Sequence, residues 1–252
     1  MKILCILTTY NDIDFLKFKK KFCDYHDLDL YVIDNYSDDG TWEWLRDNDI
    51  PSHRFDTKDM FVLPWLQAEI VRTLHSLKNK PDWVIYNGAD MFPITLPSIR
   101  SSIEVADRQG YNLMAIPRGG VFNTGEERTE NPFKTYFYGG IRKVNALEVF
   151  IHKYDESVNY FGDTVSFFGI QNRVKLEEGF IIDYGDTKTA SQRNKIYERR
   201  QKAWDANLMS LGHGTHYIKG NKCNWIWNKN DLTNFKETPQ LQYIQHLQEI
   251  LS

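Results

Sequence analysis

The sequence predicts an α/β protein with a doubly wound, mostly parallel sheet flanked by helices and an irregular C-terminal extension. Two observations predict this fold class. Short apolar segments alternate with segments of helical periodicity through the first half of the chain. In addition, two of the apolar segments run directly into acidic residues, Asp34 and Asp90. Ligands of open α/β sheets bind beyond the carboxyl ends of the strands, so these residues are the first candidates for a site.

Four apolar segments in the first half are predicted to be strands, and the segments between them helices. The predicted strands are 2–7, 28–33, 83–86 and 113–116. The predicted helices are 13–25, a segment starting near 41, 64–77 and 96–107. Ser37, Asp38 and Asp39 are suited to cap the helix that begins near Thr41, and Pro64 suits the first turn of the helix that it opens.

The second half is less regular. Residues 119–140, rich in Gly, Asn, Thr and aromatic residues, predict a long functional loop or an irregular hairpin. The remaining expected elements are a helix over 144–154, strands over 162–170 and 179–184, and helices over 191–207 and 239–251. Without a repeat or a clear linker, one compact domain with a C-terminal extension is expected.

Composition restricts the class of protein. With 252 residues, 41% of them hydrophobic and 26% charged, the chain is suited to a packed globule. A net charge of -3 disfavours a nucleic-acid-binding surface. Cys5, Cys23 and Cys223 form no C-x-x-C pair, so neither a disulfide framework nor a zinc site is expected. No segment has the length of a signal peptide core or a membrane span, which favours a cytoplasmic protein with at most peripheral membrane contact.

Three common signatures are absent from the sequence. There is no G-x-G-x-x-G after the first predicted strand, no G-x-x-x-x-G-K-[ST] and no G-x-S-x-G. Dinucleotide oxidoreductases, P-loop NTPases and α/β-hydrolases are therefore disfavoured.

Three segments at predicted strand ends stand out: Thr8-Thr9-Tyr10-Asn11, Asp34-Asn35-Tyr36-Ser37-Asp38-Asp39-Gly40-Thr41 and Gly88-Ala89-Asp90. Together they resemble the family 2 glycosyltransferases of the GT-A fold. The second segment, a D-x-x-S-x-D-G-T pattern, is the most specific, and the third stands where the family has a D-x-D motif. The resemblance covers roughly residues 1–120. It implies a single GT-A-like domain with a nucleotide-sugar-binding half (1–120), an acceptor and metal-site half (121–220) and an extension with a terminal helix (221–252).

The resemblance implies roles for individual residues. Thr8, Tyr10 and Asn11 would shape the nucleotide pocket, and Asp34 would accept a hydrogen bond from the base. Asp90 would reach a divalent cation, Mn²⁺ or Mg²⁺, that bridges the diphosphate, since such cations prefer hard oxygen ligands. Alternatively, Asp34 is an ordinary acid at a strand end, and Asp90 is a turn or capping residue.

The third segment departs from the family pattern, because Gly88 stands where the first acid of D-x-D is expected. Weaker or absent metal dependence is therefore an open alternative. His213 and His216, in a Gly-rich late loop, are the other candidate metal ligands, and His216 is preferred.

The general base that an inverting transferase needs is assigned to Asp163, with Glu177 and Asp186 as competing candidates. Trp65 and Gln67 either line the donor site or pack within a helix. A group of basic residues either draws in the diphosphate or forms a solvated helix face. These basic residues are Arg193, Lys195, Arg199 and Arg200.

The expected function is nucleotide-sugar-dependent glycosyl transfer of the hexosyltransferase type. The acceptor would be a hydroxyl of a glycan, a lipid-linked saccharide or a protein, and the family implies inversion. The first alternative is a catalytically degenerate protein that binds a nucleotide sugar or a glycan, which Gly88 keeps open. The second is a sugar-phosphate nucleotidyltransferase, disfavoured because 8–12 lack a Gly-rich basic signature.

Overall fold

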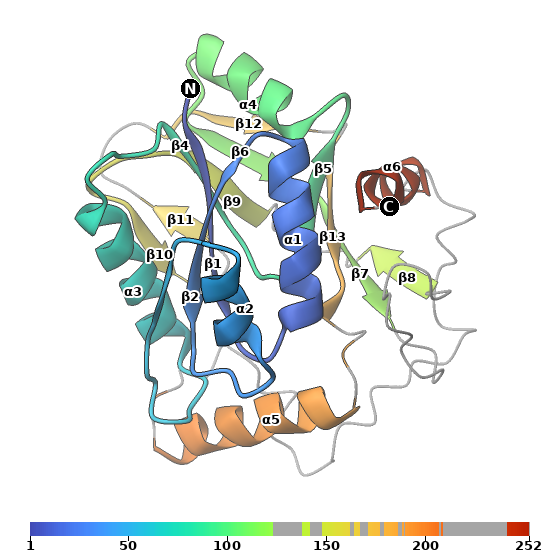
Figure 1. Ribbon diagram of the computed structural model, residues 1–252. Helices are drawn as coiled ribbons and strands as arrows, with labels where there is room; N and C mark the ends of the chain where they lie inside the picture. Colours follow the sequence, from blue (N-terminus) through green and yellow to red (C-terminus); the bar gives the residue numbers. More distant parts are fainter. Residues whose placement is uncertain are drawn as a thin grey trace.

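The protein has a mixed α/β architecture with a mostly parallel, seven-stranded sheet flanked by helices, as predicted (Figure 1). The computed structural model describes most of the first half of the chain and separate parts of the second. The described residues are 1–122, 138–141, 148–161, 164–166, 171–176, 179–185, 188, 190–206, 208 and 241–251.

The main sheet has the strand order β12-β6-β9-β4-β1-β2-β3. Its strands are β1 (Ile3–Thr9), β2 (Asp29–Asp34), β3 (Ser52–Arg54), β4 (Trp83–Tyr86), β6 (Leu113–Ile116), β9 (Glu148–Lys153) and β12 (Arg173–Lys175). β9 is antiparallel to both of its neighbours, β4 and β6, whereas the other neighbouring strands run parallel.

β1 lies at the centre of the parallel part of this sheet. Its Leu7 is in register with Val32 of β2, and its Ile6 with Tyr86 of β4. A strand covered on both faces is expected to be a continuous apolar run, which explains why β1 does not alternate polar and apolar residues. The parallel direction also brings the carboxyl ends of β1, β2 and β4 to one edge of the sheet, where Asn35 N donates to Thr9 O.

Six helices are described. They are α1 (Ile13–Tyr25), α2 (Thr41–Asp47), α3 (Leu63–Ser76), α4 (Ile99–Arg108), α5 (Ala190–Asp205) and α6 (Leu241–Leu251). α1 buries the stripe predicted from its periodicity, including Phe15, Leu16 and Phe22. α5 lies beneath the lower ends of β1 and β2 (Figure 1) and therefore covers the carboxyl edge of the sheet. None of the described helices combines the length and apolar character needed to cross a bilayer.

Two smaller sheets complete the described structure. The first has the order β5-β13-β7-β8 and contacts α6 through β5 and β13. Its strands are β5 (Met91–Thr95), β7 (Arg118–Phe122), β8 (Tyr138–Ile141) and β13 (Gly179–Asp183). The second pairs β10 (Asn159–Phe161) with β11 (Thr164–Ser166), and β10 packs on α3. The antiparallel pairing of β7 with β8 confirms the hairpin alternative for 119–140.

The prediction of a helix over 144–154 is wrong. Glu148–Lys153 forms β9, where Ile151 is in register with Ile85 of β4 on one side and with Met114 of β6 on the other. The run Val149-Phe150-Ile151 has strong strand propensity, and pairing on both sides satisfies its backbone in the sheet. The three-part division at 120 and 220 stays a prediction; β9, from the second part, lies within the main sheet.

Burial of His152 leads to a prediction about pH. Its side chain is fully buried, with Nε2 2.7 Å from the Tyr160 hydroxyl and Nδ1 2.8 Å from Lys153 O. Burial lowers the pKa of His152 from 6.5 to about 4, and the Lys153 carbonyl and Asp155 offset this only in part. As the pH falls below 6.5 the unfolded chain therefore takes up this proton first, and stability is lost down to about pH 4.

The test is to measure urea unfolding at pH 7 and pH 5 for the wild type and for His152→Gln. The wild type should lose about 2 kcal/mol more than the variant over this interval. Because other groups titrate equally in both proteins, the difference isolates His152. Equal losses in the two proteins would contradict the prediction.

Candidate functional site

The loops that follow β1, β2 and β3 at the carboxyl edge contain unusual backbone conformations. Asn11, Tyr36, Lys58 and Asp59 all have positive φ angles, between 55 and 57°. Such conformations cost of order 1 kcal/mol or more in residues other than glycine, and they tend to cluster at functional sites. The carboxyl edge is therefore the part of the described structure to examine for ligand binding.

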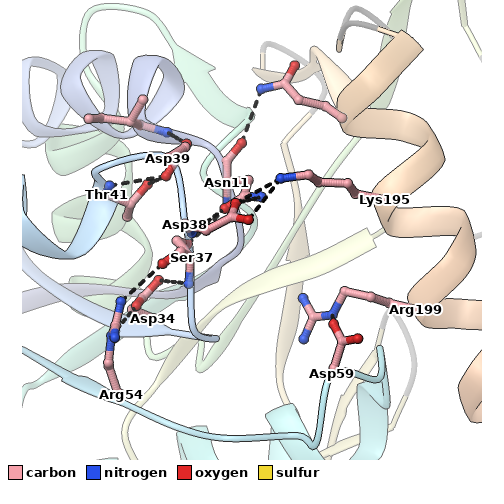
Figure 2. A network of polar contacts seen from close by, with 12 residues as sticks. Asn11, Asp34, Ser37, Asp38, Asp39, Thr41, Arg54, Asp59, Lys195 and Arg199 are labelled. Carbon is pink, nitrogen blue, oxygen red and sulfur yellow. Dashed lines mark hydrogen bonds and ion pairs between the residues drawn. The ribbon is translucent and has the colours of Figure 1, made fainter.

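Asn11 and Asp38 connect the loop after β1 to the loop after β2 (Figure 2). The Asn11 side chain donates to Asp38 Oδ1 (2.7 Å) and accepts from the Asp38 backbone N (2.8 Å). The Asn11 backbone N donates to Ser37 Oγ at 2.9 Å. The two segments that carry the family resemblance are thus held together by their own polar side chains.

Gly40 is the N-cap of α2, and Asp39, the residue before it, binds the first amide of the helix. The Asp39 carboxylate accepts hydrogen bonds from Thr41 N (3.1 Å), at the start of α2, and from Ile13 N (3.2 Å), at the start of α1. Ser37 and Asp38 bind the first loop instead of capping α2.

Asp34, the last residue of β2, is fully buried. Its Oδ2 accepts from Arg54 Nε at 2.9 Å, and its Oδ1 accepts from Ser37 N at 3.2 Å. The Arg54 guanidinium also lies over the rings of Tyr36 and Trp42, 4.9 and 5.1 Å from their centroids. Each oxygen of Asp34 thus has a protein donor, and its predicted role as acceptor for a base stays a prediction.

Helix α5 places basic and polar side chains over these loops (Figure 2). Gln192 donates to Asn11 O at 3.1 Å, and Lys195 pairs with Asp38 at 2.9 Å. Among the other basic candidates, Arg200 lies 4.8 Å from the centroid of the Phe61 ring, and the side chain of Arg193 falls outside the described structure. The basic side of α5 therefore faces acidic loops at Lys195 and is not simply a solvated surface.

Arg199 is the most buried of the basic side chains that the structure describes in α5, with 4% of its surface exposed. Its guanidinium lies 3.7 Å from the centroid of the Tyr10 ring, and Nη2 donates to Thr57 Oγ1 at 3.0 Å. Nε lies 3.6 Å from Asp59 Oδ1, but neither Nε nor Nη1 has a hydrogen-bond partner among the described residues. Burial lowers the pKa of Arg199, against the opposing effect of Tyr10 and nearby acids.

Other buried polar atoms at this edge also lack hydrogen-bond partners within the described structure. They are Thr9 Oγ1, Asn35 Nδ2 and Asn87 Nδ2, at the ends of β1, β2 and β4. A buried polar group without a partner costs about 1–3 kcal/mol. Such atoms gathered at one edge indicate a place where a ligand rich in oxygen acceptors can bind.

Asp12, Asp90 and Lys188 form a buried ionic cluster beside this edge. Lys188 Nζ lies 2.9 Å from Asp12 Oδ1 and 3.0 Å from Asp90 Oδ2. Burial raises the pKa of Asp12, as does the Asp90 carboxylate, and Lys188 only partly opposes this, leaving it at about 6. For Asp90, the effect of burial is outweighed mainly by Lys188, and its pKa is lowered.

The described residues do not fit a divalent cation at this position. No group of three potential His, Cys, Asp or Glu ligands is present among the described residues, and the two carboxylates that converge are bound by the Lys188 ammonium. The predicted ligands His213 and His216 lie outside the described residues, so their role stays a prediction.

The remaining predicted residues are distributed as follows. Thr8 is half-buried near the end of β1, while Gln67 and Trp65 lie in α3, buried and half-buried respectively. The candidate bases all lie outside the described residues: Asp163, Glu177 and Asp186.

The sequence prediction missed several residues of the site. They are Thr9, Asp12, Asn35, Arg54, Asn87 and Lys188. Thr9 and Asn35 lie within segments that were singled out, and Asp12 and Asn87 adjoin such segments, so polarity at a strand end was a usable signal. Lys188 had no such signal, because its partner Asp12 is 176 residues away.

The fold and the site together define an α/β protein with a buried polar site at the carboxyl edge of a mostly parallel sheet. No protein-family model matches the chain, and no curated protein matches its sequence. Among solved structures, it is similar to S. aureus TarS 1-349, with 13% identity and a TM-score of 0.47 over 86% of this chain and 76% of that chain.

Two further solved structures are similar to part of the chain. A mannosyltransferase from Pyrobaculum calidifontis, in complex with GDP-Man and Mn²⁺, has 17% identity and a TM-score of 0.34, covering 46% of this chain and 35% of that chain. Glucosyl-3-phosphoglycerate synthase from Mycobacterium tuberculosis, in complex with Mn²⁺, UDP and glucosyl-3-phosphoglycerate, has 16% identity and a TM-score of 0.33, covering 46% and 44%. These values are too low to assign the chain to a family.

Proposed function

We propose that this protein is a glycosyltransferase that moves a sugar from a nucleoside diphosphate donor to an acceptor hydroxyl, and that the donor binds at the carboxyl edge of β1, β2 and β4. The acceptor class is a glycan, a lipid-linked saccharide or a protein, and the sugar is of the hexose type.

The observation that carries this proposal is the concentration of unpartnered buried donors at the carboxyl edge. Arg199 Nε and Nη1, Asn35 Nδ2 and Asn87 Nδ2 all carry N–H groups without acceptors among the described residues. A nucleoside diphosphate offers phosphate and base carbonyl oxygens in one molecule, and arginine is well suited to phosphate. Tyr10, stacked on Arg199, supplies an aromatic face next to them.

The proposed reaction forms a bond between the acceptor oxygen and the anomeric carbon. The bond from that carbon to the diphosphate breaks, and its electron pair leaves with the nucleoside diphosphate. The acceptor proton passes to a general base, for which Asp163 remains the candidate from the sequence. Attack from the face opposite the leaving group inverts the anomeric centre.

A non-catalytic nucleotide-sugar-binding protein is the second candidate. Gly88 favours it, since an acid is missing where the related D-x-D motif has one. Such a protein would bind the nucleotide in the same place but would not release the sugar.

A thermal-shift panel with UDP, GDP, CDP and dTDP tests the proposal. One of the four should raise the melting temperature, since a ligand at a hundredfold excess over its Kd stabilises the native state by about 2.7 kcal/mol. Turnover of the matching nucleotide sugar then separates the transferase from the binding protein. Absence of a shift with all four would refute the donor site.

A pair of variants on α5 localises the binding. Arg199→Ala should weaken nucleotide binding at least about tenfold, because it removes a buried, stacked guanidinium. Lys202→Ala, on the same helix but with an exposed side chain that pairs with Asp59, should bind within about twofold of the wild type. Equal losses in both variants would show that α5 contributes only general positive charge.

A further inference from the structure

Lys188 occupies the position between two buried carboxylates that a bound cation would take. It is 8% exposed, and its Nζ lies 2.9 and 3.0 Å from the two oxygens of Asp12 and 3.0 Å from Asp90 Oδ2. Asp12 follows the end of β1 and Asp90 follows the end of β4, so the ammonium lies at the same carboxyl edge as the proposed donor site.

Gly88 and Gly185 make room for this arrangement. A Cβ atom on Gly88 would lie 2.5 Å from Asp90 Oδ1, and a Cβ atom on Gly185 would lie 3.2 Å from Asp90 Oδ2. The first distance is far below van der Waals contact. An aspartate at 88, as in a D-x-D motif, is therefore incompatible with the observed position of Asp90. The glycine at position 88 and the Asp90–Lys188 ion pair are therefore linked, because Gly88 leaves the space that the Asp90 carboxylate occupies.

A cation already lies between the two carboxylates. Lys188 Nζ contacts both of them, and a second buried lysine, Lys19, donates to Asn87 Oδ1 at 3.3 Å, in the segment between β4 and Asp90. A divalent cation on Asp12 and Asp90 would meet the Lys188 ammonium within a few ångströms, and this repulsion is poorly screened inside a protein.

Lys188 remains charged in this environment. Burial lowers the pKa of Lys188, but the Asp12 and Asp90 carboxylates more than offset this and raise it above the ordinary value of lysine. An ammonium group has three N–H donors, and three carboxylate oxygens of Asp12 and Asp90 lie within 3.0 Å of Lys188 Nζ. Lysine is a common phosphate ligand, which acts as a point charge.

We infer that the Lys188 ammonium takes the place of the divalent cation, so that the protein binds the diphosphate of its donor without a metal ion. The inference rests on the proposed function for the identity of the ligand. Asp12 and Asp90 then act as positioning residues that hold the ammonium, and the developing negative charge of the leaving diphosphate is stabilised by Lys188 together with Arg199.

The first experiment measures binding of the responsive nucleoside diphosphate to the wild-type protein by calorimetry, once with EDTA and once with Mn²⁺. The two Kd values should agree within about twofold. A Kd at least about tenfold weaker in EDTA would overturn the inference. This comparison needs no variant and so does not depend on whether any variant folds.

The second experiment measures Mn²⁺ binding alone, by the decrease in the electron paramagnetic resonance signal of the free ion. Lys188→Met removes the charge at nearly constant length and leaves two carboxylates facing each other, so it should bind Mn²⁺ at least about tenfold more tightly than the wild type. Lys20→Met, which removes an exposed lysine of α1, should behave like the wild type. Tight Mn²⁺ binding by the wild type that is lost in Asp90→Asn would overturn the inference.

The two experiments distinguish failure of the inference from failure of the proposed function. If no nucleoside diphosphate binds under any condition, the donor site is wrong, and the Mn²⁺ measurement still decides whether Lys188 excludes a metal ion. If the nucleotide binds to Lys188→Met at least about tenfold more weakly in EDTA and Mn²⁺ restores it, the ammonium and the metal ion are interchangeable, as inferred. Unchanged binding by that variant in EDTA would overturn the role of Lys188.

Discussion

Replacing Asp34 by asparagine should lower the free energy of unfolding by about 3 kcal/mol, because it removes one partner of a buried ion pair. The Asp34 side chain is fully buried, whereas the Arg54 side chain is 28% exposed, so water relieves only part of the loss. The amide also places an N–H donor against either Arg54 Nε or Ser37 N, both of which are donors. Urea denaturation at pH 7 measures the change.

Asp29→Asn is the matched control for this change. Asp29 begins the same strand that Asp34 ends, but it is exposed and lies 3.7 Å from an exposed lysine, Lys2. Its replacement should change stability by no more than about 0.5 kcal/mol. If Asp34→Asn were as mild as Asp29→Asn, the buried contacts of Asp34 with Arg54 and Ser37 would not stabilise the fold as expected.

Asp90→Asn should reduce turnover of the nucleotide-sugar donor by about 100-fold, which corresponds to about 2.7 kcal/mol of transition-state stabilisation. The carboxylate holds the Lys188 ammonium at 3.0 Å, and an amide in its place supplies no charge to fix the position of Lys188. The loss should fall mainly on kcat, since the charge matters most when the diphosphate is leaving.

Asp24→Asn is the control for turnover, because Asp24 is an exposed acid of α1 that pairs with Lys20 away from the carboxyl edge. It should leave kcat within about twofold of the wild type. Circular dichroism and the melting temperature of Asp90→Asn show whether the fold is retained. A folded Asp90→Asn protein with unchanged kcat would exclude Asp90 and the ion pair from catalysis.

The four predicted strands and the helices between them in the first half were predictable because their local patterns agree with their tertiary surroundings, whereas the short strands β3 and β5 were not predicted. Ile13–Tyr25 has apolar residues at helical spacing, and Trp83–Tyr86 is a short apolar run bounded by Pro, Asn and Gly. Glu148–Lys153 was not predictable in the same way. Its backbone is satisfied by β4 and β6, which lie far from it in sequence, and that pairing decides its conformation.

The candidate site was predictable to the extent that it follows strand ends. Asp34 was named because acids at the carboxyl ends of parallel strands lie where ligands bind, and Tyr10 and Asn11 were named from the family resemblance. The structure links Asn11 to Asp34 through Ser37. The orientation of each side chain was not predictable, because it depends on loops and on α5. Arg199 lies over Tyr10 only because α5, far along the chain from β1, returns across this edge of the sheet.

The fold class, the acidic residues at strand ends and the turn in which Asp39 binds the first amide of α2 follow from the sequence alone, since these depend on contacts between near neighbours. Only the tertiary structure decided that Asp90 is bound to Lys188 and that Arg199 is buried against Tyr10. Both contacts join residues far apart in the chain, and the energy of a buried charge depends on which groups surround it. No local pattern records those surroundings.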